Sequence, residues 1–411
     1  MTISTGTGTD SAVAVGILRS TDAIRERAEF LLRRARAGES RWFVVDDDAL
    51  AQAADLVADV TRTRYPDLVI PYHSRWRHFE AGGVDRTADL RARLAGLDAA
   101  AQARAMIDLA VVSVLLDAGA GPDWGYTEPV TGQRFTRSEG LGVASWHAFA
   151  DGLFSSDLAQ PWQVDATALC AIDDAALGQA FQAAPDNPLV GLSGRVQLLR
   201  RLGAALEDRP EVFGPLGRPG GLFDVLAGPE VHAHDILVRL LGTLSGVWLA
   251  DNDIGGIPLG DCWPHPAVPG PGLSRGWMPF HKLSQWLTYS LLEPFEWAGA
   301  PVTGLDALTG LPEYRNGGLL LDAGVLRLRD PAAADRTWSV ADELVVEWRA
   351  LTVALLDELA PLVRAALGLD SAALPLACVL EGGTWAAGRT LAQQLRGGNP
   401  PLSISSDGTV F

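Results

Sequence analysis

The stretch that decides the fold is SVADELVVEWRALTVALLDELAPL, residues 339–362. Ser339 stands at its start and Asp342 follows three positions later, an arrangement close to the capping box that opens many helices. Beyond this point apolar side chains recur every three or four residues, which is the spacing of one helix face. The stripe comprises Leu344, Trp348, Leu351, Leu355, Leu359 and Leu362. The stretch therefore predicts a long amphipathic helix, which Pro361 bends or ends.

Helical periodicity extends over much of the remaining chain. Thr21 is a candidate N-cap, the apolar positions that follow it recur every three to four residues, and Gly38 suits a left-handed C-cap. Further helices are predicted over residues 48–64, 104–116, 196–206 and 233–249. Strand signals are few: residues 319–321 and 325–328 flank Gly324, and Asp407-Gly408 favours a tight hairpin turn. We therefore predict a mainly α fold with a few short β-hairpins.

Domain organisation follows from the absence of a long linker. Residues 1–14 are predicted to be a flexible tail, and residues 15–411 a single, large, mainly helical catalytic domain. The Pro- and Gly-rich stretches 208–221 and 264–276 are short enough to be loops within one fold. The alternative places a sub-domain boundary near residue 210.

Charge and composition exclude several classes of protein. The chain of 411 residues has 33 Lys and Arg against 50 Asp and Glu, a formal net charge of −17, which opposes a nucleic-acid partner. Its three cysteines are widely spaced, which favours a reducing compartment over a disulfide framework or a cysteine-built zinc site. Neither a signal peptide nor an apolar run of membrane-spanning length is present. The sequence thus predicts a soluble, cytoplasmic protein with no membrane partner, and it leaves the oligomeric state open.

Four segments combine polar and aromatic residues without a helical face to hold them. The first, residues 71–80, contains His73, Arg75, Arg77 and His78 among three aromatic residues. This density of aromatic side chains is typical of a pocket wall. Two alternatives remain: a basic loop that bridges acidic neighbours, or a zinc site built from His73 and His78, for which no third ligand is identifiable.

The second and third segments each offer candidate catalytic groups. Asp261 lies in a glycine- and proline-rich loop, where it would orient a hydroxyl group, act as a general acid or base, or simply form an Asx-turn. His281 and Lys282 fall at the start of a predicted helix, where backbone N–H groups and the lysine would gather an anion. An ordinary capped amphipathic helix is the alternative for this third segment.

The fourth segment, LTGLPEYRNGG at residues 308–318, holds a carboxylate next to an aromatic ring and a guanidinium. Pro312 fixes the backbone immediately before Glu313, and Arg315 follows two residues later. A Glu–Arg ion pair on a turn is one interpretation. The other is that Glu313 supplies a fixed negative charge to a cationic transition state.

Long motifs are spread over nearly all of the sequence. They are YPDL at 65–68, HSRWRHFEAGG at 73–83, SVLLDAGAG at 113–121, RSEG at 137–140, NPLVG at 187–191, PFHKLSQWLTYS at 279–290, LTGLPEYRNGG at 308–318 and DGTVF at 407–411. Together these motifs resemble the uracil catabolism protein 4 family. The resemblance implies a role in a pyrimidine-salvage route in which uracil is first made into its nucleotide, the ring is then opened, and a ribosyl-urea species and urea appear downstream.

A more distant similarity links two of these motifs to the queuosine salvage proteins, which are all-α N-glycosidases related in fold to helix-hairpin-helix DNA glycosylases. This similarity implies a glycosylase-like helical core in which Glu313 occupies the position of the catalytic aspartate before Tyr-Arg. Leu311 replaces a ring-stacking phenylalanine, so the leaving group is not expected to be a large flat base. Glu381 and Trp385 match further binding positions of those proteins.

These residues suggest hydrolysis of a ribosyl C–N bond. Glu313, ionised with help from Arg315, would stabilise the positive charge that develops at C1′ and O4′. Asp261 or His281 would protonate the leaving nitrogen. Residues considered for substrate binding, the 5′-phosphate included, are His73, Arg75, Arg77, His78, Lys282, Leu311, Arg315, Glu381 and Trp385. The expected substrate is a ribosyl-urea 5′-phosphate or a ring-opened uridine nucleotide, with no cofactor and no metal.

Two rival functions come from other classes. One is a metal-dependent amidohydrolase that acts on the opened pyrimidine ring, with His73, His78 and a carboxylate as ligands. The other is a non-enzymatic module that binds a pathway enzyme.

Overall fold

The computed structural model describes residues 6–248, 250 and 252–405, so the predicted turn at Asp407-Gly408 lies outside the described residues. The described chain is mainly helical, and its strands pair into short two-stranded sheets. This confirms the predicted fold class at that level. The chain divides into two compact units whose segments alternate along the sequence. Unit 1 comprises residues 6–73, 252–285 and 304–405, and unit 2 comprises 74–248, 250 and 286–303. Whether one catalytic domain spans 15–411 stays a prediction.

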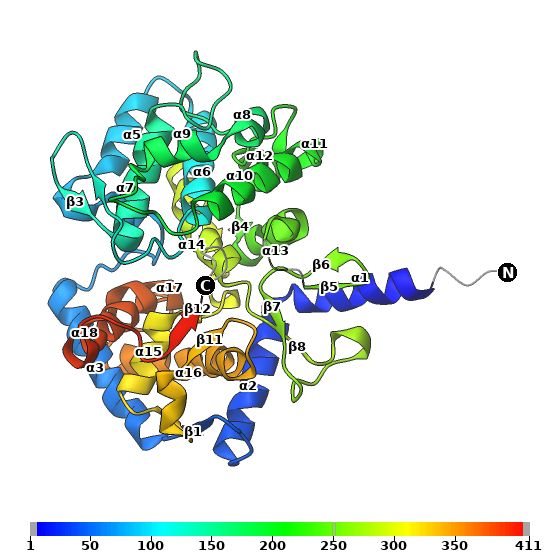
Figure 1. Cartoon of the computed structure of the whole chain (residues 1–411), viewed down its shortest axis with the longest axis vertical. Coiled ribbons are helices and arrows are strands. Elements are labelled where there is room, and N and C mark those ends of the chain that lie inside the picture. Colours follow the sequence, from blue (N-terminus) through cyan, green and yellow to red (C-terminus); the bar gives the residue numbers. More distant parts are fainter. Residues whose placement is uncertain (1–5, 249, 251, 406–411) are drawn as a thin grey trace. The chain divides into compact units, whose positions relative to one another are not determined.

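Unit 1 is organised around the helix that the opening stretch of sequence predicts. This helix, α16 (Glu343–Leu367), packs against α2 (Thr21–Arg36) and α3 (Asp48–Arg64), as Figure 1 shows. Its side chains from Leu344 to Leu356 are buried on all faces, charged residues included. A helix that is buried all round forms the centre of its unit rather than its surface.

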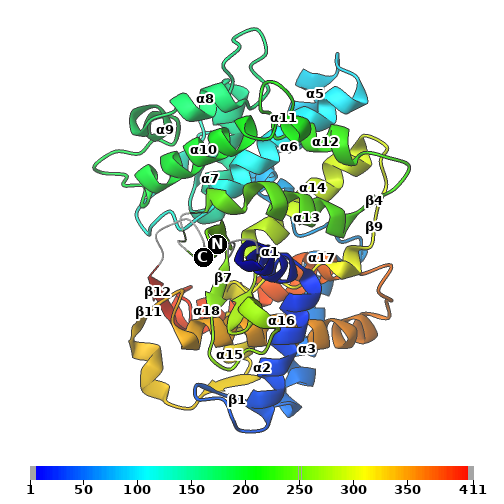
Figure 2. The same cartoon turned by 90° about the vertical axis from the view of Figure 1, so that its right-hand side faces the viewer.

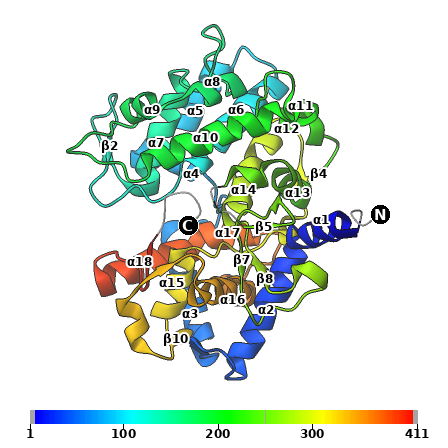
Figure 3. The ribbon, with the colours of Figure 1, turned by 45° about the vertical axis from the view of Figure 1, so that its right-hand side comes forward.

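The remaining elements of unit 1 surround α16. Its helices are α1 (Gly6–Leu18), α15 (Tyr314–Asp322), α17 (Leu376–Val379) and α18 (Trp385–Arg396), with a π-helical turn η6 (Leu380–Thr384) between the last two. Short 3-10 turns are η3 (Gly272–Ser274), η4 (Leu305–Ala307) and η5 (Pro331–Asp335). The paired strands are β1 (Phe43–Val45) with β10 (Leu326–Leu328), β5 (Asp253–Ile254) with β6 (Ile257–Pro258), β7 (Cys262–Pro264) with β8 (Trp277–Pro279), and β11 (Thr337–Ser339) with β12 (Ser403–Ser405). Figure 3 shows α15 beside α18.

Unit 2 is a second helical assembly, visible in Figure 2 around α6 and α10. Its longer helices are α5 (Arg86–Leu94), α6 (Ala99–Leu115), α7 (Arg137–Ala150), α10 (Leu192–Glu207) and α13 (Ala233–Leu244). Shorter turns of helix are α4 (Trp76–Phe79), η1 (Ala81–Gly83), α8 (Ala166–Ala171), α9 (Asp174–Ala180), α11 (Pro210–Phe213), α12 (Gly221–Leu226) and η2 (Ser245–Val247). Strand β2 (Tyr126–Thr127) pairs with β3 (Arg134–Phe135), and β4 (Val231–His232) pairs with β9 (Val302–Thr303). Helix α14 (Lys282–Trp297) begins with residues of unit 1 and continues with residues of unit 2.

Several predicted elements are confirmed with small changes of boundary. The helix at 48–64 has these bounds, and α16 begins after the N-cap Asp342 and continues through Pro361 to Leu367. The predicted strand at 319–321 is wrong, because these residues belong to α15. Residues 6–14, within the predicted flexible tail, form part of helix α1, whose Ala14, Val15 and Leu18 pack on an apolar cluster with Leu259.

None of the helices in the described part of the chain is long and apolar enough to cross a membrane.

Candidate active site

Glu313 is the N-cap residue of α15, and its carboxylate closes the start of that helix. Its Oε2 accepts a hydrogen bond from the backbone N–H of Arg315 at 2.7 Å, and its Oε1 accepts one from Asn316 at 2.6 Å. These two bonds satisfy donors that a helix N-terminus otherwise leaves unpaired. Because each carboxylate oxygen can accept two hydrogen bonds, each retains capacity for a second contact. The side chain is 8% exposed and is therefore held in a fixed position within the protein.

The electrostatic environment of Glu313 differs from the one that the sequence suggested. Burial raises the pKa of Glu313 above its ordinary value, although the two N–H bonds and the positive charges of Lys282 and His73 oppose this rise. Arg315 lowers this pKa as expected, but it acts through its backbone N–H and not through its guanidinium. That guanidinium lies 4.6 Å from the ring centroid of Tyr314 and donates to the carbonyl of Gly398, and only the backbone of Arg315 contacts Glu313.

Lys282, the first residue of α14, is the single lysine among the 33 basic residues of the chain. Every other basic side chain of the Lys/Arg class is an arginine. A lysine carries a compact charge on a flexible stem, whereas an arginine carries a planar and delocalised one. The one lysine of the sequence thus lies where its charge acts on Glu313.

His73 and Glu381 form a second polar group in unit 1. His73 Nδ1 lies 2.8 Å from Glu381 Oε2, and the other carboxylate oxygen accepts from Arg64 at 2.9 Å and from the Tyr65 hydroxyl at 3.1 Å. Burial opposes ionisation of Glu381, but the contacts with His73 and Arg64 outweigh it and lower its pKa to about 2. The ring of Trp385 packs 6.2 Å from that of His73, centroid to centroid. Glu381 therefore fixes the orientation and the proton of the His73 ring.

Glu381 lies in the π-helical turn η6, and two glycines of this turn allow it to approach α3. A Cβ on Gly383 would come within 2.5 Å of the backbone oxygen of Val57, and one on Gly382 within 3.1 Å of Thr61. Gly388 on α18 is equally constrained, since its Cβ would lie 2.1 Å from the carbonyl of Arg315 on α15. Close contacts made possible by glycine thus bring the elements that carry Glu313, Glu381 and Trp385 together.

Asp261 is also buried, but its carboxylate is fully paired. Arg349 binds both of its oxygens at 2.8 Å, and the backbone N–H of Lys282 and the indole Nε1 of Trp263 donate at 2.9 and 2.7 Å. Although burial acts in the opposite direction, these contacts lower the pKa of Asp261 to about 2. Four hydrogen bonds use the acceptor capacity of a carboxylate. An ionised, saturated carboxylate has no proton to give, so this geometry argues against Asp261 as the general acid.

His281 is buried beside Asp261, with its Nε2 atom 2.9 Å from the carbonyl oxygen of Leu18. The carbonyl accepts, so Nε2 carries the proton and donates it in this bond. Burial lowers the pKa of His281, which favours a neutral ring. Its backbone has a positive φ of 49°, and its N–H donates to the carbonyl of Asp261. These contacts support a role in fixing the start of α14.

The structure assigns the residues of the HSRWRH motif to both units. His73 belongs to unit 1, whereas Arg75, Arg77 and His78 belong to unit 2. Arg75 is fully buried and pairs with Asp117 at 3.0 Å and with the Ser113 hydroxyl at 2.6 Å. Arg77 pairs with Glu293 at 2.7 Å, and His78 packs edge-on against Trp286. Both arginines thus have acidic partners, which weakens the argument for either as a phosphate ligand.

Leu311 lies two residues before Glu313 and is buried. Its carbonyl accepts from the Asn316 side chain at 3.0 Å and from the Glu313 N–H at 3.0 Å. These bonds fix the backbone just ahead of the carboxylate.

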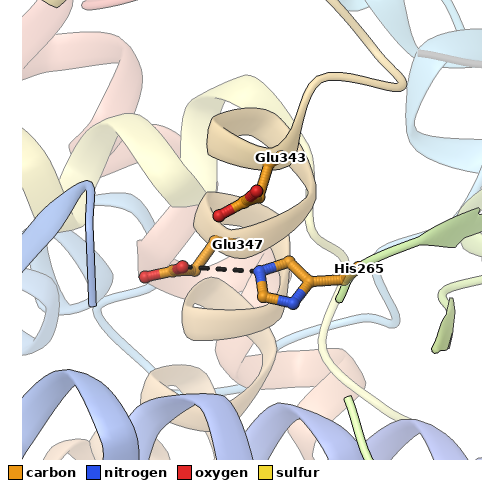
Figure 4. A group of neighbouring side chains, drawn as sticks. All are labelled: His265, Glu343 and Glu347. Atoms are coloured by element: carbon orange, nitrogen blue, oxygen red, sulfur yellow. Dashed lines mark ion pairs between the residues drawn. The ribbon is translucent and has the colours of Figure 1, made fainter. Parts of the chain in front are cut away.

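A group of potential metal ligands lies elsewhere in unit 1. Single ligand atoms of His265, Glu343 and Glu347 lie within 4.8 Å of one another (Figure 4). In unit 2 a cavity of about 240 Å³ has neither a carboxylate nor a histidine in its lining, and so offers no acid–base group. Its lining residues are Arg91, Ala99, Gln102, Ala103, Met106, Pro294, Trp297 and Ala298.

Sequence reasoning missed Arg64, Tyr65 and Arg349, which pair with the carboxylates of the site. Arg349 lies within the stretch of α16 whose side chains are buried on every face. A charged residue at such a position has to find a partner on folding, because an unpaired buried charge is costly. That signal was readable in the sequence, whereas the identity of the partner, 88 residues away, was not.

Comparison with known proteins adds a family and two relatives. The profile of a family described as "Protein of unknown function (DUF1688)" matches residues 17–411. The chain is 40% identical to "Protein urg3" of Schizosaccharomyces pombe over 410 residues, which are 98% of this chain and 100% of that protein. It is 37% identical to "Uracil catabolism protein 4" of Lachancea kluyveri over 438 residues, which are 97% of this chain and 99% of that protein.

Proposed function

Because the chain belongs to the DUF1688 family, we propose that it acts, like the relative named for uracil catabolism, in the breakdown of uracil. We further propose that it is a hydrolase of the N-glycosidase type, which cleaves the C–N bond of a ribosyl-urea, its 5′-phosphate or a ring-opened uridine nucleotide. The glycosylase-like, helix-hairpin-helix-related core stays a prediction that accompanies this proposal.

The observation that carries the proposal is the fixed, buried carboxylate of Glu313. Two backbone N–H groups hold it at the start of α15, and no arginine lies within ion-pair distance of it in the part of the chain that the structure describes. A buried negative charge without an ion-pair partner is costly to the folded protein. It becomes favourable when a cation develops beside it, as at C1′ and O4′ of a ribosyl group. Preorganised charge of this kind contributes about 3–4 kcal/mol to catalysis.

The leaving nitrogen of a urea needs a proton, and His73 is the residue we assign to this step. Its Nδ1 is held by Glu381, so the proton that the ring would deliver is the one on Nε2. Both His73 and Glu313 belong to unit 1, and a positive charge on His73 lowers the pKa of Glu313. This assignment replaces Asp261 and His281, whose contacts support structural roles.

Lys282 is the preferred ligand for a 5′-phosphate. Its ammonium affects Glu313, and Arg75 and Arg77 already have acidic partners. In the reaction, water attacks C1′ as the C–N bond breaks. The nitrogen takes a proton from His73, and the proton that the attacking water loses passes through solvent back to His73. The products are ribose or ribose 5-phosphate and the urea product.

The metal-dependent amidohydrolase remains the alternative enzyme, although its two histidine ligands belong to different units and Nδ1 of His73 contacts Glu381. A non-enzymatic role as a pathway partner stays the second alternative, and the absence of turnover on every ring-opened substrate would favour it.

The decisive experiment incubates the protein with synthetic ribosyl-urea, with and without a 5′-phosphate, and measures free ribose and urea. We expect release by the wild type and a loss of about 10²–10³-fold or more in kcat for Glu313→Gln. The amide oxygen of glutamine still accepts a helix N–H, so substrate affinity and thermal stability are expected to change little.

Glu358→Gln is the matched control, because this partly exposed glutamate on α16 pairs with Arg36 at the surface. It is expected to keep the wild-type rate. A Glu313→Gln variant that turns over at a near-normal rate would refute the mechanism, as would a wild type that releases neither product.

His73→Gln tests the proton donor separately. We expect kcat to fall by about 10²-fold, since general acid catalysis typically contributes this much. The readout that a structural role would not move is the pH profile: the decline of kcat at alkaline pH should disappear. An unchanged profile in a folded variant would remove His73 from this role.

A further inference from the structure

A histidine and two glutamates in unit 1 converge outside the proposed active-site residues (Figure 4). Glu343 and Glu347 lie four residues apart on α16, so they share a helix face. His265 directly follows strand β7 and is held by backbone bonds from its N–H to Gly276 and from Val268 to its carbonyl. Two separate elements therefore present three ligand-type side chains to one point.

His265 is the residue whose ring nitrogen is available to a ligand. Its side chain is 2% exposed, and its Nε2 atom has no hydrogen-bond partner. This atom points at Glu347 Oε2, 3.4 Å away. That separation is long for a hydrogen bond between nitrogen and oxygen. Two ligands that each lie about 2.1 Å from one tetrahedral zinc ion are also about 3.4 Å apart.

The carboxylates are oriented by donors behind them. The Ser40 hydroxyl donates to Glu347 Oε1, and the Trp42 indole donates to Glu343 Oε1 at 3.3 Å. Each glutamate thus has one oxygen that accepts a hydrogen bond from a residue just before β1. Its other oxygen remains for a ligand. Outer hydrogen bonds of this kind orient the ligands of metal sites.

The charge of the cluster also calls for a cation. Two glutamates meet a histidine, and in the described residues no lysine or arginine forms an ion pair with either carboxylate. Glu347 and His265 are buried, whereas Glu343 is partly exposed and leaves a route from solvent. One imidazole and two carboxylates are ligands that suit zinc among the divalent metals.

We propose that His265, Glu343 and Glu347 form a binding site for a divalent transition-metal ion, Zn²⁺ in particular, that joins the start of α16 to the loop after β7. Coordination through Nε2 requires the ring proton on Nδ1, so the 3.3 Å contact from the Ala267 N–H must be given up. The loss of this contact lowers the affinity for the metal ion, and the attraction of the two carboxylates for the ion offsets the loss. Three protein ligands leave a fourth position for water.

The test uses the full-length protein, first dialysed against a chelator and then titrated with Zn²⁺ alone. We expect one zinc per chain by calorimetry and elemental analysis, and a rise in Tm, because an ion that binds only the folded state stabilises it. Titration with Co²⁺ should give a visible absorption band from the same site. None of these readouts depends on turnover, so the result is independent of the proposed glycosidase.

Glu347→Gln and His265→Asn are expected to weaken binding by at least about tenfold. Glu343→Gln, at a partly exposed position, should weaken it as well and covers the case in which a buried variant does not fold. Glu358→Gln on the same helix is the control that should bind normally. The proposal would be overturned if the wild type did not bind Zn²⁺, or if all three variants bound it as tightly as the wild type.

Discussion

Asp261 and Glu313 are both buried carboxylates at helix starts, yet their environments oppose each other. Asp261 accepts from the first N–H of α14 and is also paired at both oxygens with Arg349, so its pKa falls to about 2. Glu313 accepts from two N–H groups of α15 without an arginine partner, so burial dominates and raises its pKa. The neighbour, rather than the depth of burial, thus distinguishes a structural carboxylate from one available for chemistry.

The largest expected effect comes from breaking the paired carboxylate. Asp261→Asn leaves the buried Arg349 charge uncompensated, and we expect the free energy of unfolding to fall by about 3–5 kcal/mol. Urea unfolding followed by circular dichroism measures this change. Glu313→Gln should change it by less than about 1 kcal/mol, since a helix cap remains. Equal losses in the two variants would contradict the distinction drawn here.

The pKa shifts of Asp261 and Glu313 have opposite signs, so stability and activity should depend on pH in different ranges. The pKa of Asp261 is lowered from 3.8 to about 2, so its pair contributes stability above about pH 4 and loses it as the pH falls toward 2. The pKa of Glu313 is raised, so folding disfavours its ionised form. As the pH is lowered, Glu313 therefore takes up its proton at a higher pH than an ordinary glutamate. We therefore expect kcat to decline, as the pH is lowered, at a pH above 4.5, while the protein remains folded.

Activity and circular dichroism measured over the same pH series provide the check. A decline in kcat only below pH 4.5, or only together with unfolding, would argue that an ordinary or structural carboxylate is responsible.

A smaller effect is expected from the charge of Lys282. Lys282→Gln removes a positive charge that lowers the pKa of Glu313, so the acid decline of kcat should move to higher pH. Lys282→Arg keeps the charge and should leave the decline close to that of the wild type, which makes it the matched control. The pH profiles of the two variants measure this difference. Identical profiles would show that the lysine does not act on Glu313.

Periodicity identified α16 and the two helices α2 and α3 that pack against it, because an amphipathic face is a local property of the chain. The N-caps lie at Ser20 and Asp342 rather than at the predicted Thr21 and Ser339. The strand predicted at 319–321 failed for a physical reason. Gly317 and Gly318 hide the start of α15, yet Gly317 is required there because a Cβ would lie 2.7 Å from the Trp348 ring. The partners of a buried charge, such as Arg349 for Asp261, arise only from tertiary contacts and could not be predicted.

The fourth sequence segment supplied Glu313 as a candidate and the resemblance supplied Glu381, but neither gave their surroundings. The role first given to the Arg315 guanidinium rested on sequence proximity, whereas the structure turns this side chain toward Gly398 and Tyr314. Two residues that are close in sequence have backbones that are close, but the sequence does not determine the direction in which the Arg315 side chain points. Local motifs therefore identified the carboxylates, and only the folded environment distinguished them.

The π-helical turn at η6 has a consequence for how this chain tolerates length changes. A wide turn holds one residue more than an α-helical path would, and an α-helix rotates by about 100° per residue. Deleting one residue at 382 or 383 would let α17 and α18 merge into a regular helix. The backbone would gain in regularity, but the chain would lose Gly382 or Gly383, which allow this turn to lie against α3. The number of residues in this turn is consequently as specific a requirement as the identity of any side chain.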